Sequence, residues 1–259
     1  MAAGKPCRKN YEEIFEEWHA EFPFLKRYSP TTMYERVGPF MMGLRVEQDE
    51  DKEDETGYSN YYRLFYEIVP LWITDPKLWG ASIMDELRIE KKRWFRKVSR
   101  QAWVQYWRHD LLFKETLEAA KSQFGEVVGS TIKLADMVDF IEAAYKRSHD
   151  NISSIRFKLE LGLGVYLNNE ALINEVWRKI EEVKCDVDRF EYRNGFGYDD
   201  WVNKMHEFAG DRAGLMANIE RNCTRPRIAR LNVGEFTGVE DNRPKTNWRD
   251  RLSGLFSKT

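Results

Sequence analysis

The residues with the clearest chemical potential are a run of cations that ends in two tryptophans. Residues 88–108 hold eight Lys or Arg side chains against a single acid. On an unbroken helix, the spacing 3, 4, 3, 4 aligns Arg93, Arg96, Arg100, Trp103 and Trp107 on one face. Guanidinium groups pair with phosphates and exposed indoles stack on bases, as binding of a single-stranded nucleic acid requires. The same groups suit an acidic protein, so the stripe predicts a binding surface of either kind.

The same segment also has a purely structural interpretation. Ile83, Leu87 and Trp94 fall on the opposite helical face, which is the ordinary pattern of an amphipathic surface helix. A helix break near Ser99 would turn the two indoles into the core. The acidic run 47–55 offers a third interpretation, because it is able to lie against the basic face and neutralise it.

Histidine is scarce, and two of the four histidines precede an aspartate, as His109-Asp110 and His149-Asp150. In a helical context, separated His and His-Asp elements resemble the metal-dependent HD phosphohydrolases. The resemblance implies metal-assisted hydrolysis at His109, His149 and Asp150, completed by a distal aspartate. The polar residues on both sides of His149 depart from the apolar, glycine-containing surroundings of that family's pair.

Other catalytic signatures are missing from the sequence. It contains no GxSxG, HExxH, Walker-type or EF-hand pattern. Cys7, Cys185 and Cys223 are odd in number and far apart, which argues against a disulfide framework or a zinc ribbon and favours a reducing cytoplasm. We therefore expect no cofactor and no resident metal, and a non-catalytic role is favoured.

Composition limits the partners further. The 259 residues include 41 Lys or Arg and 43 Asp or Glu, so the net charge is −2 and no overall field steers the chain to a polyanion. Apolar runs are far shorter than the roughly 20 residues that span a bilayer. No apolar stretch follows the polar N-terminus, so a signal peptide and a membrane partner are not expected.

Periodicity predicts the elements that position these residues. Residues 11–22 repeat like a helix, whereas 39–46 and 61–71 read as two strands of a hairpin joined by the acidic run. Later segments predict helices, at 83–98, 100–124, 134–147, 171–183, 199–208 and 211–223. Residues 155–167 fit both a strand, by strict alternation, and a helix; the helix is favoured because Gly162 and Gly164 permit close approach.

These elements predict an α+β fold that is predominantly α-helical, with an N-terminal helix and a β-hairpin packed on a multi-helix body. We expect a single globular domain over 1–236, with the hairpin region at 38–72 and the helical body at 74–223. The polar segment 237–259 is expected to be a loosely ordered C-terminal tail.

The function predicted from these patterns is that of a non-catalytic interaction or adaptor protein, which binds a protein partner through the basic-aromatic helix face of residues 88–108. A nucleic-acid-binding protein that uses the same face is the first alternative. A helical metal-dependent phosphohydrolase at the His-Asp pairs is the second.

Overall fold

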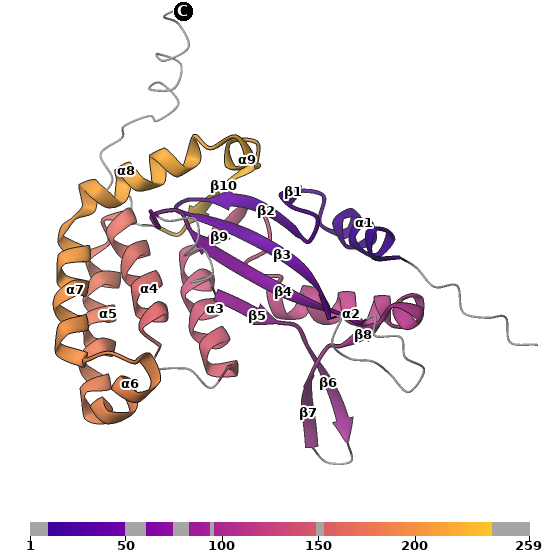
Figure 1. Cartoon of the computed structure of the whole chain (residues 1–259), viewed down its shortest axis with the longest axis horizontal. Helices are drawn as coiled ribbons and strands as arrows, with labels where there is room; N and C mark the ends of the chain where they lie inside the picture. The colour runs from indigo at the N-terminus through magenta and orange to yellow at the C-terminus, as the bar shows by residue number, and fades with distance from the viewer. Residues whose placement is uncertain (1–9, 50–60, 75–82, 94–95, 149–152, 240–259) are drawn as a thin grey trace, which may run out of the picture.

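The computed structural model describes residues 10–49, 61–74, 83–93, 96–148 and 153–239, and the side chains of 49 and 91–98 lie outside this description. The predicted tail lies outside the described residues beyond 239, and the acidic run lies outside them beyond 49. Within them the fold is α+β, with a curled sheet between groups of helices (Figure 1).

The central sheet is built mainly from consecutive antiparallel strands. The strands β2 (Thr32–Val37), β3 (Phe40–Asp49), β4 (Tyr61–Pro70) and β5 (Ile83–Glu86) pair in chain order. The late strand β10 (Val233–Thr237) runs parallel to both β2 and β9 (Thr131–Lys133) and joins them. Two short strands, β1 (Lys26–Arg27) and β8 (Val104–Gln105), pair with β2 and β4.

The two strands predicted from period-two patterns are confirmed as β3 and β4. Leu44 and Val46 alternate on one face of β3, and both are buried against Leu64 and other residues of the core. Burial on one face fixes the register of a strand, because a slip of one residue would expose the whole set. Two strands alone are marginal in water, and the structure supplies neighbouring strands on both sides of the pair.

Most predicted helices are confirmed, with small shifts at their ends. The first, α1 (Tyr11–Glu21), begins at a capping box between Asn10 and Glu13. The helices that follow are α2 (His109–Phe124), α3 (Leu134–Arg147), α4 (Ser154–Leu167), α5 (Glu170–Val183), α6 (Val187–Asn194), α7 (Tyr198–Gly210), α8 (Arg212–Cys223) and α9 (Pro226–Ala229).

The ambiguous segment 155–167 is the helix α4. Residues on several sides of the helix are buried, including Phe157, Gly162 and Leu163, so its apolar residues cannot mark a single face. A Cβ added at Gly162 would lie 2.5 Å from the indole of Trp72. The glycine thus permits the close approach that favoured the helix.

Two predicted helices, at 83–98 and over the first part of 100–124, are wrong. The described part of this segment forms strands instead: β5, then β6 (Arg88–Arg93), β7 (Arg96–Gln101) and β8. Ile83 and Leu87 fit a helical face, but together with Asp85 they also alternate with Met84, which is 40% exposed. Pairing of β5 with the buried strand β4 decides between the two periods, which the sequence pattern leaves open.

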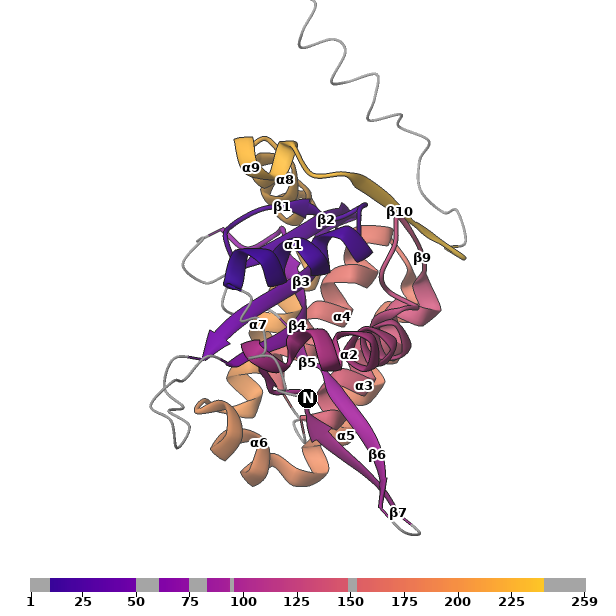
Figure 2. The ribbon, with the colours of Figure 1, turned by 90° about the vertical axis from the view of Figure 1, so that its right-hand side faces the viewer.

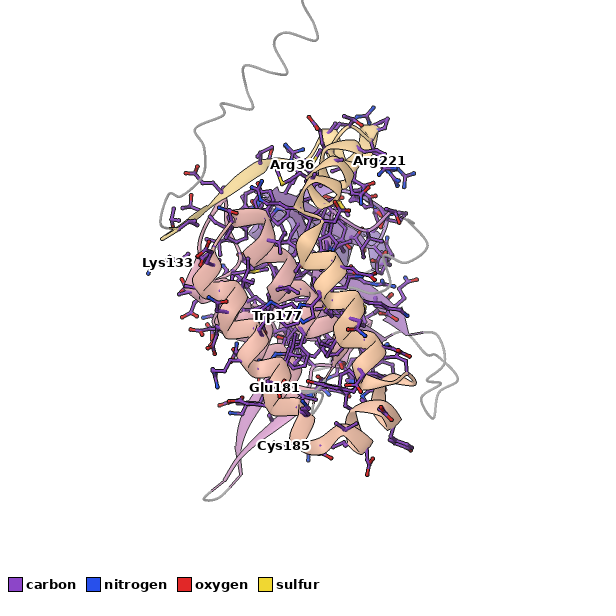
Figure 3. All side chains as sticks on the ribbon, turned by 90° about the vertical axis from the view of Figure 1, so that its left-hand side faces the viewer. Arg36, Lys133, Trp177, Glu181, Cys185 and Arg221 are labelled. Atoms are coloured by element: carbon purple, nitrogen blue, oxygen red, sulfur yellow. The ribbon has the colours of Figure 1, made fainter. Side chains whose placement is uncertain are left out.

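The strands β6 and β7 form a separate two-stranded hairpin, which we call the basic hairpin (residues 88–101). It extends away from the body below β5 and β8, and the same projection is visible after a quarter turn (Figures 1 and 2). Helices α5 and α7 form the opposite flank, where Trp177 lies midway along α5 (Figure 3).

Candidate functional site

The basic hairpin holds seven of the eight cations of the 88–108 cluster. Its register places Lys92 opposite Lys97 and Arg93 opposite Arg96. Like charges at directly opposite positions of an antiparallel pair repel each other and weaken the pair. The register of the hairpin therefore places cation opposite cation at two successive positions.

Contacts at the base of the basic hairpin tie it to the body. The Arg88 amide N–H donates to Oε1 of Gln123 at 2.9 Å, and the Arg88 guanidinium donates to the Arg147 carbonyl at 3.1 Å. The Ala102 amide N–H donates to the Leu87 carbonyl at 2.9 Å. The first two bonds attach the base of the hairpin to α2 and α3, and the third joins the two chain segments of the base to each other.

The five predicted binding residues do not form one helical stripe, and this part of the prediction is wrong. Arg93, Arg96 and Arg100 belong to the two strands of the basic hairpin, and the side chain of Arg100 is exposed. Trp103 lies just before β8, and Trp107 lies in a short 3-10 turn. A strand has a period of two, so the helical spacing no longer aligns the indoles with the arginines.

The two indoles nevertheless lie at the surface rather than in the core. Trp103 is half-buried, and the guanidinium of Arg63 lies 4.9 Å from its ring centroid. Trp107 is 42% exposed, and Leu111, four residues onward in the chain, is 74% exposed. Trp107 and Leu111, together called the apolar shoulder, are the nearest exposed apolar residues on the chain after the hairpin.

Among the predicted catalytic residues, only His109 is described; His149 and Asp150 lie outside the described residues. His109 is the first residue of α2 and is completely buried. Its Nδ1 lies 2.8 Å from the Tyr62 hydroxyl and its Nε2 lies 2.7 Å from a carboxylate oxygen of Glu17. The phosphohydrolase prediction therefore remains a prediction.

Glu17, His109 and Asp110 form a cluster in which one potential ligand atom from each lies within 4.8 Å of the others. Sequence reasoning missed Glu17, which is 92 residues from His109. It also missed Tyr62, whose hydroxyl contacts the imidazole. These residues are far apart in the sequence and meet only because α1 packs against α2. A local sequence pattern therefore does not link them.

Several other buried charges already have partners of opposite charge. Asp85 accepts from the Arg147 guanidinium at 3.1 Å. Glu160 accepts from Arg156 at 2.8 Å and from Lys179 at 3.1 Å. Buried charges need such compensation. The Asp85–Arg147 contact joins β5 to α3 and the Glu160–Lys179 contact joins α4 to α5, whereas the Arg156–Glu160 contact lies within α4. We assign them to structure.

A hollow of about 430 Å³ lies at the lower end of α5, and it is open to solvent. Its lining consists of Arg178, Glu181, Glu182, Lys184 and Cys185, of which Glu181 and Cys185 are marked in Figure 3. The charged groups pair with one another, as in the Lys184–Glu181 contact at 3.2 Å. This hollow therefore resembles an ordinary solvated helix end.

No known protein family, curated protein or solved structure matches the chain. Within the described residues, none of the helices combines the length and apolar character needed to cross a bilayer.

Proposed function

We propose that this chain is a nucleic-acid-binding protein that docks the basic hairpin against a duplex. The observation that carries the proposal is the register, which opposes Lys92 to Lys97 and Arg93 to Arg96. Like charges at opposed positions repel each other, and a bound polyanion would reduce that repulsion. Phosphates of nucleic acid supply that charge at high density.

The shape of the hairpin favours a duplex over a single strand. A two-stranded β-ribbon fits the major groove of B-DNA, which is about 12 Å wide. Backbone alternation distributes the basic positions over both faces of the ribbon, so both walls of a groove would meet cations. The indole of Trp103, which the helical interpretation assigned to base stacking, already lies against the guanidinium of Arg63.

With a net charge of −2, the chain as a whole does not attract a polyanion, so binding would depend on where the positive charges are concentrated. Because cations gather on the hairpin, the remaining surface is on balance acidic and adds no general attraction for phosphates. Binding is thus expected to depend on a few contacts and to weaken steeply as salt rises.

The exposed and half-buried thiols of Cys185 and Cys223 are free, which supports a reducing compartment such as the cytoplasm.

The direct test is a titration of a fluorescent duplex of about 20 base pairs with the full chain at low salt, read by anisotropy. An Arg96→Glu, Arg100→Glu variant is expected to bind at least about tenfold more weakly and to lower the salt slope by about 2. The matched control is Arg227→Glu, Arg230→Glu, which reverses two exposed charges near α9, at the end of the molecule where Figure 3 marks Arg221.

Two results would contradict the proposal. The first is the absence of any anisotropy change at low salt with duplex DNA or duplex RNA. The second is an equal loss of affinity in the hairpin variant and in the α9 control, which would indicate nonspecific attraction by net charge. Tighter binding of a single strand than of the duplex would instead favour base stacking on an exposed indole, that of Trp107.

An acidic protein is the second candidate partner, and the apolar shoulder favours it. Trp107 and Leu111 are exposed and follow the hairpin within ten residues of the chain, and a protein interface typically buries an aromatic anchor of this kind next to charges. Trp107→Ala is expected to abolish capture of such a partner on an affinity column while urea unfolding stays unchanged. Tyr192→Ala, at a residue 92% exposed on α6, is the matched control. Loss of the fold in Trp107→Ala would instead make the indole structural.

A further inference from the structure

We propose that Glu17, His109 and Asp110 bind a divalent transition-metal ion, with zinc as the best match. The cluster joins α1 to the first turn of α2, and its three potential ligand atoms lie within 4.8 Å of one another. One imidazole nitrogen with two carboxylates forms a mixed donor set that suits zinc, manganese or cobalt better than magnesium or calcium. This inference goes beyond nucleic-acid binding, because the cluster lies on the body rather than on the basic hairpin.

The imidazole is held in an orientation that a metal ligand requires. His109 is completely buried, and its ring lies between Tyr62 and Phe113, with centroids at 5.6 Å and 4.8 Å. The Tyr62 hydroxyl contacts Nδ1 at 2.8 Å, so Nε2 is directed toward the carboxylate of Glu17. Metal-ligating histidines almost always have their second nitrogen fixed in this way by a neighbouring polar group.

The distance between Glu17 and His109 requires only a small rearrangement. Zinc bonds of about 2.1 Å at tetrahedral angles place two ligand atoms about 3.4 Å apart. Nε2 and the Glu17 oxygen are 2.7 Å apart, which is a direct hydrogen bond. The Glu17 side chain is 37% exposed, so its carboxylate is able to move outward by the required fraction of an ångström.

Protons and charges balance in the metal-bound form. Coordination through Nε2 requires the imidazole proton on Nδ1, where it donates to the Tyr62 oxygen. A neutral imidazole and two carboxylates then carry the two negative charges that a dication needs. The N-terminus of α2 opposes the cation with only about half a positive charge.

The open side of the cluster points to the kind of site. Glu17 is partly exposed and Asp110 is exposed, so coordination positions beyond the three protein ligands face solvent. Three protein ligands with a position left for water are typical of a reactive rather than a purely structural zinc site. The site uses the His109 of the predicted His-Asp pair, but it recruits Glu17 and requires neither His149 nor Asp150.

The test uses the full chain, stripped with a chelator and then titrated with zinc by calorimetry and with cobalt by visible absorption. We expect one ion per chain. Glu17→Gln and Asp110→Asn should each weaken binding at least about tenfold, and Tyr62→Phe about tenfold, as for other residues that orient a ligand. The control is His206→Ala, because His206 is an exposed histidine followed by an acid and stacked on Trp177 at 4.1 Å.

Three results would overturn the site: no stoichiometric binding of either metal, unchanged affinity in both carboxylate variants, or loss of binding in His206→Ala. The two carboxylate variants carry the test because substitution of the buried His109 would also remove packing. Since no nucleic acid enters the titration, its failure leaves the proposed function untouched, and failure of the duplex titration leaves the metal site untouched.

Discussion

The central sheet and the basic hairpin use the same antiparallel pairing with opposite electrostatics. In the central sheet, Glu47 lies opposite Arg63, and their side chains approach to 3.3 Å. In the basic hairpin, Lys92 lies opposite Lys97 and Arg93 lies opposite Arg96. The first arrangement stabilises its own register, whereas the second weakens it.

This difference separates charges that serve the fold from charges available to a partner. Arg63 also lies 4.9 Å and 5.2 Å from the ring centroids of Trp103 and Phe65, so its surroundings within the protein account for it. In the basic hairpin, the register places the residue type of the same charge on the facing strand at both of these positions. A count of charges along the sequence does not distinguish the two cases, because only pairing reveals which charges face each other.

Among the substitutions considered, the largest change in the free energy of unfolding is expected at Glu35. This buried carboxyl belongs to the central sheet, but unlike Glu47 it lies opposite an apolar residue, Met42, rather than a cation. Burial raises the pKa of Glu35 from its ordinary 4.5 to about 7, and hydrogen bonds from Gly129 and Ser130 act in the opposite direction. A raised pKa means that the folded state binds the proton more tightly than the unfolded state. Its stabilisation is therefore complete below about pH 4.5 and is lost as the pH rises toward 7.

Glu35→Gln removes the buried charge and is expected to raise the free energy of unfolding at about pH 8 by roughly 2–3 kcal/mol. At about pH 5 the same substitution should have little effect. Urea unfolding at both pH values measures the difference, with Glu235→Gln as an exposed control. An equal effect at both pH values would show that Glu35 stays ionised in the folded protein.

An intermediate loss of stability is expected when two like charges are placed opposite each other in the central sheet, as they are in the hairpin. Arg63→Glu places a second acid opposite Glu47 and removes the stacking on Trp103, which together should cost about 1–2 kcal/mol. Chemical denaturation compares this variant with Lys204→Glu, a charge reversal at an exposed position of α7. Equal stabilities of the two variants would mean that the pair across β3 and β4 contributes nothing to the register.

The smallest effect on stability is expected when the hairpin is given the electrostatics of the central sheet. Lys97→Glu opposes an acid to Lys92 and should stabilise the fold by about 0.5 kcal/mol while it weakens duplex binding. Lys92→Glu, Lys97→Glu restores like charges and should return the stability toward the starting value; together with Lys92→Glu alone, it closes a double-mutant cycle. A parallel loss of stability and binding in Lys97→Glu would contradict the separation of folding and binding charges.

Sequence patterns predicted the helices well where one face is buried and the other solvated. The helix α3 is such a case, with Met137, Ile141 and Ala144 buried on one side and Lys146 exposed. Patterns failed over residues 83–105, where a few apolar residues satisfy two periods at once. The late strand β10 was also missed, because it is short and largely exposed, and its pairing with β2 spans most of the chain.

The candidate sites divide in the same way. The identity of the basic residues came from the sequence, since charge is a property of each residue type. Their arrangement on opposed strands did not, and neither did the approach of Glu17 and Tyr62 to His109 across 92 and 47 residues.

The sequence by itself determined the α+β class, the β3–β4 pair, most helices and the concentration of positive charge near residue 90. Those properties depend on residue type and on local periodicity, which every short segment carries within itself. The tertiary structure decided that the basic segment is a ribbon and that His109 lies between Tyr62 and Glu17. Such choices depend on the free energy of contacts between distant segments, which arise only when the whole chain packs.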